Sequence, residues 1–265
     1  MVGTEAIISL FVCAVLTFAI PIAALVIFKK KHRETSLLSA VIGAATFIVF
    51  ALVLEQFLHL VMLPIVTGST VAYVLYGTLA AGVFEESGRF VACKLLMKKR
   101  SDNANAVMMG IGHGGIEAII LIGFGMISYI SMAFMVNSMG IDAIAEMSGI
   151  TDEANLVLLK NQVDSVVAFS ISTALINVVE RVLAMALHIS MSVVVMKAAT
   201  VKGKLWLYPA AILMHAMFDV PAVLYQRGVI TSIWLVQLFL AVLAAAAVFA
   251  AVRASKLGQK ESATA

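Results

Sequence analysis

Charged residues are scarce in this chain. Only 12% of its 265 residues are Asp, Glu, Lys or Arg, whereas 62% are hydrophobic, and the mean hydropathy is +1.06. Soluble domains average about 25% charged residues and about half apolar ones. A soluble fold of this length would not bury so much apolar surface, so we expect the solvent of this chain to be lipid.

Cysteine is also scarce, with Cys13 and Cys93 in different apolar segments and no Cys-x-x-Cys spacing. This pattern excludes a thiolate metal site and fits two small buried apolar side chains. The net charge of +3 comes without a basic stripe or a nucleic-acid-binding motif, which excludes nucleic acid as a partner.

Two further features are missing from the sequence. No basic residue precedes the first apolar run, which contains Glu5 and is followed by a basic cluster at residues 29–33. We therefore expect an uncleaved first membrane helix rather than a secretory signal peptide. No internal repeat is visible, so an inverted-repeat transporter gains no support.

Seven apolar segments reach the length of about 20 residues that a membrane-spanning helix needs. They cover approximately residues 5–28, 36–62, 71–93, 106–136, 165–196, 206–226 and 229–252. Residues 137–164 are more polar, and we expect a surface loop with one short helix there. The predicted fold is all-α: a polytopic membrane helix bundle of about seven transmembrane helices, forming a single integral membrane domain over residues 1–265.

Lysine and arginine are unevenly distributed among the connecting loops. One set of loops holds fourteen of the eighteen basic residues, namely Lys29, Lys30, Lys31, Arg33, Lys94, Lys98, Lys99, Arg100, Lys197, Lys202, Lys204, Arg253, Lys256 and Lys260. The opposite loops hold only Lys160 and Arg227. Because cytoplasmic loops carry an excess of Lys and Arg, we expect the N-terminus outside and the C-terminus in the cytoplasm.

Ionisable side chains on four of these segments lie at nearly the same predicted depth. Counted at about 1.5 Å per residue, they lie roughly 10–16 Å below the basic surface. Each costs about 2.5–3.5 kcal/mol within a bilayer on insertion scales, which favours a functional role. The sequence therefore predicts a buried metal or hydrolytic site formed by Glu85, Glu86, His113, His188 and His215.

The adjacent glutamates Glu85 and Glu86 point about 100° apart on a helix. Arg89 follows at i+4 and i+3 and can neutralise one of them. The other carboxylate then remains available as a general base on water. The alternative is a structural ion-pair cluster that holds helices together.

The histidines fall in two kinds of pattern. His113 lies in the glycine-rich stretch 110–115, where small residues permit close helix approach and also favour a kink or a substrate gap. His113 with Glu117, and His215 with Asp219, are i, i+4 pairs on one helix face. His188 is either a third metal ligand or a residue that orients the glutamate pair.

A deeper polar layer supports the predicted site, at roughly 16–25 Å from the basic surface. Its members are Glu117, Asp219, Glu180 and Arg181. Arg181 needs an acidic partner, for which Glu55 is a candidate at similar depth. His59 is expected near the outer interface, outside the site.

With these residues the chain resembles the YhfC-type intramembrane metallopeptidases of bacteria, which are related to the CAAX-protease and bacteriocin-processing (CPBP) group and to the PrsW-type proteases. The resemblance covers roughly the second to the sixth segment. It rests on Glu85-Glu86-x-x-Arg89, His113-x-x-x-Glu117, Glu180-Arg181 with His188, and His215-x-x-x-Asp219. It implies Glu85 and Glu86 for water activation, His113 for the second motif, and His215 with Asp219 for the third.

The chain departs from the CAAX-type pattern in two places. That pattern has its basic residue one position later than Arg89, and a Phe four residues before the second-motif histidine. Here Met109 precedes His113 and Ala184 precedes His188 at that spacing. The resemblance therefore does not choose between the two histidines, nor between zinc and a metal-free glutamate mechanism.

The resemblance implies a multi-pass protease of the bacterial cytoplasmic membrane that cuts a membrane-embedded or membrane-associated protein. We expect Zn²⁺ held by some of His113, His188, His215 and Glu86, with Arg89 setting the charge of the glutamate pair. The alternatives are a transporter or channel for a metal ion or proton, and an inactive scaffold of the same fold that binds substrates. The sequence predicts no oligomeric state.

Overall fold

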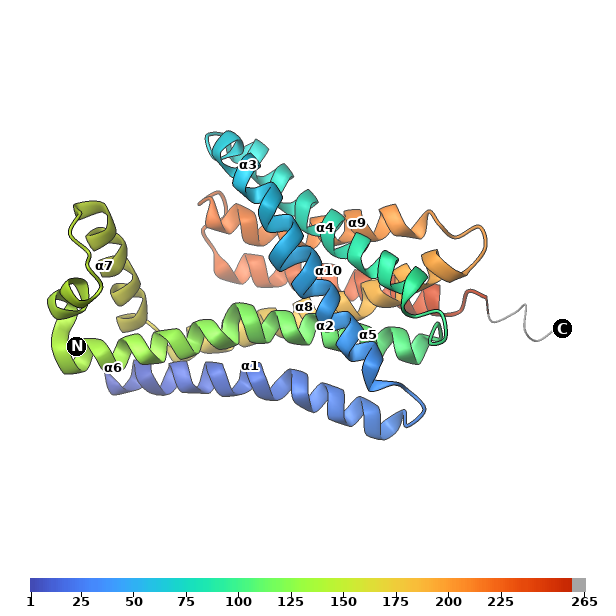
Figure 1. Ribbon diagram of the computed structural model, residues 1–265, viewed down its shortest axis with the longest axis horizontal. Coiled ribbons are helices and arrows are strands. Elements are labelled where there is room, and N and C mark those ends of the chain that lie inside the picture. The colour runs from blue at the N-terminus through green and yellow to red at the C-terminus, as the bar shows by residue number, and fades with distance from the viewer. Residues whose placement is uncertain (259–265) are drawn as a thin grey trace. The chain divides into compact units, whose positions relative to one another are not determined.

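The computed structural model describes residues 1–258, and every regular element in that range is a helix (Figure 1). Lys260, one of the basic residues counted above, lies outside the described residues. The elements are α1 Thr4–Lys31, α2 Leu37–Val49, the π-helix η1 Phe50–Glu55, α3 Gln56–Val66, α4 Thr70–Leu95, α5 Asn103–Ala118, the π-helix η2 Ile119–Gly123, α6 Phe124–Met147, α7 Glu153–Val167, α8 Ile171–Thr200, α9 Leu207–Gln226 and α10 Ile233–Ser255.

Six helical stretches are long and apolar enough to cross a membrane. They are Thr4–Lys31, Leu37–Val66, Asn103–Met147, Ile171–Thr200, Leu207–Gln226 and Ile233–Ser255. The 26-residue α4 corresponds to the predicted segment 71–93 and contains the glutamate pair and Arg89. The prediction of an all-α membrane bundle with about seven spans is therefore confirmed. The direction in which the chain crosses the membrane stays a prediction.

The chain divides into two compact units. The first contains Met1–Ile20 and Ala118–Arg181, and the second contains Pro21–Glu117 and the residues from Val182 onward. Each unit has its own apolar core, with fully buried Leu10 and Cys13 in the first and Met191 and Met196 in the second. The interpretation of residues 1–265 as a single membrane domain stays a prediction.

The stretch 137–164 in the first unit is more helical than predicted. Helix α6 continues to Met147 across a break at Gly140, whose φ of +78° is a conformation that glycine adopts without strain. A second helix, α7, begins after Asp152, whose side chain accepts a hydrogen bond from the backbone N–H of Asn155. The prediction of a loop with one short helix was therefore wrong in its extent, because residues beyond Gly140 are helical as far as Met147 and α7 forms as well.

Glycines in the second unit bring helices into close contact. A methyl group added at Gly43 of α2 would overlap the carbonyl oxygen of Met109 in α5, and one at Gly112 would overlap that of Ala40 in α2. A methyl group at Gly110 would overlap the backbone of Ile189 in α8. Helix α5 runs unbroken through this stretch. Close approach is therefore confirmed, whereas the expected kink is absent from α5 and the suggested substrate gap at 110–115 stays a prediction.

Helix α4 is held in the same way from two other helices. A methyl group at Gly82 would lie 2.6 Å from the carbonyl oxygen of Ile212 in α9, and one at Gly88 would lie 2.7 Å from the Phe50 ring of η1. Such contacts leave little freedom to slide or rotate, because packed helices cannot accept added volume without backbone shifts. The helix that carries Glu85 and Glu86 therefore has a fixed rotation within its unit.

We predict that Gly112→Ala destabilises the protein by about 1–3 kcal/mol, because the new methyl group forces α5 away from α2. The measurement is the midpoint of thermal unfolding in detergent. Gly77→Ala in α4 is the matched control, since a methyl group there meets no atom within 4 Å. That control should match or exceed the wild type, because Ala favours a helix by about 1 kcal/mol over Gly. Equal melting of both variants would contradict the packing described here.

Candidate functional site

Four helices of the second unit place ionisable side chains in one buried cluster. Helix α4 provides Glu85, Glu86 and Arg89, α5 provides His113 and Glu117, α8 provides His188, and α9 provides His215 and Asp219. Glu86, Arg89 and His113 have no exposed surface, and only Asp219 is markedly exposed, at 29% of its side chain. The residues predicted from depth alone therefore do meet, although their roles stay predictions.

Glu85 lies at the centre of this cluster and faces three histidines. Its Oε2 lies 2.8 Å from His113 Nε2 and 3.8 Å from His188 Nδ1, and its Oε1 lies 3.9 Å from His215 Nε2. Arg89 Nη2 is 3.7 Å from the same carboxylate. Of the two glutamates, Glu85 is therefore the one that the imidazole rings surround.

Glu86 is the glutamate that Arg89 neutralises. Its Oε1 accepts hydrogen bonds from Arg89 Nη1 and, at 2.6 Å, from His215 Nδ1. Its Oε2 is buried and has no hydrogen-bond partner in the described part of the chain. Because buried carboxylate oxygens are rarely left unpaired, Oε2 marks a position where a water molecule or a substrate group belongs.

The protonation of His113 follows from its neighbour in α2. Thr46 Oγ1 donates to the carbonyl oxygen of Gly43 at 2.6 Å, so it can only accept from His113 Nδ1, at 3.1 Å. Nδ1 therefore carries a ring proton, and Nε2 forms a hydrogen bond with Glu85 Oε2 at 2.8 Å. Phe47 packs edge-on against the same ring, with centroids 5.4 Å apart, and so fixes its orientation.

His215 and His188 are held in opposite ways. His215 donates Nδ1–H to Glu86, and its Nε2 faces Glu85 at 3.9 Å and Asp219 at 3.6 Å. His188 Nδ1 accepts from Arg89 Nη2 at 2.5 Å, because a guanidinium can only donate. Its Nε2 forms an ion-pair contact with Glu117 Oε2. Both nitrogens of His188 thus have close partners, whereas His215 Nε2 lies 3.6 Å or more from the carboxylates of Asp219 and Glu85.

This donor set fits a metal ion. One ligand atom from each of Glu85, His113 and His188 lies within 4.8 Å of the other two. Metal-binding histidines usually donate their other N–H to an oxygen, as His113 does to Thr46 and His215 does to Glu86. Distance thus favours His188 as the third ligand, whereas the hydrogen bonds favour His215. Two histidines and one carboxylate form a ligand set found in catalytic zinc sites.

The structure gives partners for several residues of the predicted supporting layer. Glu117 forms an ion pair with His188 of α8, a partner on another helix that the i, i+4 spacing with His113 did not indicate. Arg181 pairs with Glu180 at 2.6 Å, two turns before His188 on α8 and in the first unit, so a supporting role for this pair stays a prediction. Glu55, suggested as a partner of Arg181, lies 3.4 Å from His59.

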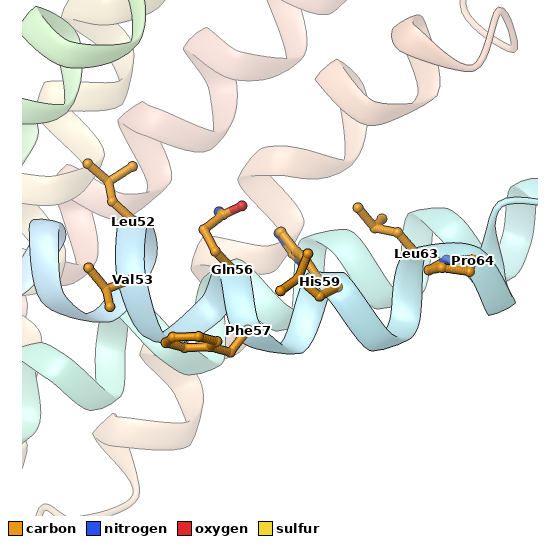
Figure 2. A pocket seen from close by; sticks show the side chains of 8 residues that line it. Leu52, Val53, Gln56, Phe57, His59, Leu63 and Pro64 are labelled. Carbon is orange, nitrogen blue, oxygen red and sulfur yellow. The ribbon is translucent and has the colours of Figure 1, made fainter.

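His59 lies outside the cluster, as expected, and is bonded to Tyr76 through Nδ1 at 2.6 Å. It borders a separate cavity of about 500 Å³ along η1 and α3 (Figure 2). The other lining residues are Leu52, Val53, Gln56, Phe57, Leu60, Leu63 and Pro64. No member of the Glu85 cluster lines this cavity, so we treat the two as distinct.

Two residues that hold the site were not predicted from the sequence. Thr46 and Phe47 lie within an apolar run, where a single Thr is common and a Phe is expected. Their importance follows from the close approach of α2 to α5 at Gly43, which places both against His113. A pattern read along one helix gives no signal for such a contact.

This chain is similar to a known protein family and to one curated protein. The YhfC intramembrane metalloprotease family matches residues 16–240. A Bacillus subtilis (strain 168) protein described as "Uncharacterized membrane protein YhfC" is 36% identical over 265 residues, which cover 98% of this chain and 100% of that protein. No solved structure matches the chain. With a family match over most of its length and a relative of equal extent, this chain belongs to the YhfC intramembrane metalloprotease family.

Proposed function

We propose that this chain is an intramembrane metallopeptidase that hydrolyses a peptide bond in a membrane-embedded or membrane-associated protein. The observation that carries this proposal is the pair of imidazoles, His113 and His215, whose Nδ1–H groups are anchored on oxygens while their Nε2 atoms face Glu85. The family to which the chain belongs supports the same activity.

Glu85, His113 and His215 are the proposed ligands of a zinc ion. Zinc bound there would lower the pKa of a water molecule and polarise the carbonyl group of the substrate. His188 is assigned an orienting role, because Arg89 and Glu117 occupy its two nitrogens. Arg89 thereby bridges Glu86 and His188, and its planar guanidinium is fixed at both sides.

Glu86 is the proposed general base. Arg89 opposes its charge and so favours the carboxylate form that a base requires. Oε1 is occupied by Arg89 and His215, which leaves the unpaired Oε2 to accept a proton from water. The water oxygen bonds to the peptide carbon, the C–N bond breaks, and the proton passes from Glu86 to the leaving amine.

We predict that substitution of the two glutamates removes different properties of the protein. Glu85→Gln loses bound zinc, whereas Glu86→Gln keeps it and loses hydrolysis by about 100-fold or more, since a general base contributes about 10²–10⁴-fold. Zinc is measured by mass spectrometry on protein purified without chelators, and hydrolysis with fluorescein-labelled casein and quenched apolar peptides in detergent. Glu55→Gln, a buried carboxylate outside the cluster, is the matched control and keeps both properties.

Two results would contradict these assignments. Equal zinc in the wild type and Glu85→Gln would remove Glu85 from the ligand set. A wild type that holds zinc but cuts none of the probes would favour the transporter or the inactive scaffold over the protease.

The histidine variants identify the third ligand. We predict that His113→Ala and His215→Ala lose zinc, while His188→Ala retains most of it, because only the first two rings anchor Nδ1–H on an oxygen and turn Nε2 toward Glu85. His59→Ala, which alters a histidine outside the cluster, should bind zinc normally. Loss of zinc in His188→Ala with retention in His215→Ala would reverse the assignment.

Thr46 is predicted to be a positioning residue. Thr46→Val removes the acceptor for His113 Nδ1–H and should lower zinc affinity about 10–100-fold, the usual effect of losing such a partner. Competition with a chromophoric chelator measures the affinity. Thr46→Ser should restore it, whereas Thr78→Val, in which the buried hydroxyl bonds only to Val74 of its own helix, should leave it unchanged. Equal affinity in Thr46→Val and Thr78→Val would contradict this role.

A further inference from the structure

A second cavity in this unit has a different chemistry from the glutamate and histidine cluster. It has a volume of about 380 Å³ and lies among α8, α9 and α10. Met191 of α8, Met214 of α9 and Phe249 of α10 contribute to its apolar lining, and Trp206 lies at the start of α9. None of the residues assigned to the proposed metal site lines it.

Arg253 is the one charged residue in this lining. Its guanidinium stacks on the Phe249 ring, 5.0 Å from the centroid. It forms no ion pair within residues 1–258, and Trp206 and Phe249 are 60% and 61% exposed. The cavity thus combines an apolar interior with a cation that has no anionic partner in the described structure.

The cavity is lined in part by Trp206, Arg253 and Leu257, which lie in or beside basic terminal segments. Asn103, at the start of α5, donates to the carbonyl oxygen of Ser255 at the end of α10, 2.9 Å away. Lys202, Lys204 and Lys256 lie in the same terminal segments, and residues 197–204 and 249–258 contain no Asp or Glu. An anionic ligand at Arg253 would therefore meet further positive charge.

The nearest acidic residue in the adjoining loop is engaged elsewhere. Burial alone would raise the pKa of Asp102, but hydrogen bonds from the side chain and backbone of Asn105 lower it below its usual range. Its charge interacts with Lys197. Asp102 is therefore a stable anion that offsets Lys197, which leaves the charge of Arg253 available.

We propose that this cavity binds an anionic phospholipid, with one acyl chain in the apolar interior and the phosphate on Arg253. A guanidinium binds phosphate through paired hydrogen bonds, and Trp206 has the position typical of a tryptophan at a membrane interface. Basic pockets between membrane helices favour anionic head groups. The acyl chain of a zwitterionic lipid would also fit the apolar interior of the cavity. The cationic group of its head group, however, would lie near the lysines and be repelled by them.

The site has a structural connection to α8 and α9. Met191 follows His188 by three residues and Met214 precedes His215 by one, so a bound acyl chain packs against the helices that carry two of the site histidines. The proposal does not depend on the chain being a protease, because it rests on the cavity and its charge alone.

The chain's two tryptophans allow a direct test. Trp234→Phe leaves Trp206 beside the cavity, and Trp206→Phe leaves Trp234, which is 67% exposed at the opposite end of α10. Each variant is reconstituted in phosphatidylcholine with increasing amounts of brominated phosphatidylglycerol or brominated phosphatidylcholine, which quench nearby indoles. We expect brominated phosphatidylglycerol to quench Trp206 at a several-fold lower mole fraction, and both lipids to quench Trp234 alike.

Further variants distinguish specific binding of the anionic lipid in the cavity from nonspecific attraction of that lipid to a basic surface. In the Trp234→Phe background, Arg253→Gln and the cavity-filling Ala250→Phe should each abolish the preference, while Arg253→Lys should keep part of it. Arg227→Gln is the matched control, because Arg227 stacks on Tyr73 at the same 5.0 Å but does not line this cavity. Equal quenching of Trp206 by both lipids, or a preference that survives in Arg253→Gln and Ala250→Phe, would overturn the proposal.

Discussion

The ion pair between Glu86 and Arg89 is the interaction on which the polar centre depends. Both side chains are fully buried in a helix of the membrane bundle, where an unpaired charge would be costly. The pair lies within one turn of α4, so forming it needs no other helix. The remaining hydrogen-bonding groups of the pair bind histidines from two other helices. Arg89 donates to His188 of α8, and Glu86 accepts from His215 of α9. Helices α8 and α9 are thereby positioned by a contact that α4 makes with itself.

Close backbone contact supplies the second constraint. Gly43 and Thr46 are three residues apart on α2, so they share the face that α5 approaches. The approach that Gly43 permits is what brings the Thr46 hydroxyl within 3.1 Å of His113. A larger residue at 43 would thus disturb a hydrogen bond one turn away. One face of α2 thus provides both the close packing against α5 and the hydrogen bond to His113, so a change in the packing also changes the site.

Much of this arrangement could be predicted from the sequence because helices are regular. The constant rise per residue converts distance from a basic flank into depth, so the meeting of Glu85, His113, His188 and His215 was predictable. Rotation about each helix axis is not encoded in depth. The choice of Glu86 as the partner of Arg89, the contact of Glu117 with His188, and the role of Thr46 all depend on rotation and therefore required the structure. The break at Gly140 was missed because a single glycine in the sequence does not show where the backbone leaves the helical conformation.

The π-helix η1, which joins α2 and α3 into one rod, has a consequence for how this family can change over time. A π-turn accommodates one residue more than an α-turn of the same length, and each residue rotates a helix by about 100°. Thr46 lies before η1 and His59 after it, and each faces a different partner. Deletion of one residue from 50–55 would therefore rotate α3 relative to α2 about the helix axis, although every remaining side chain would be unchanged. Such a deletion would change which side chains of α2 and α3 share a helix face. The length of this segment should therefore be under tighter selection than its composition.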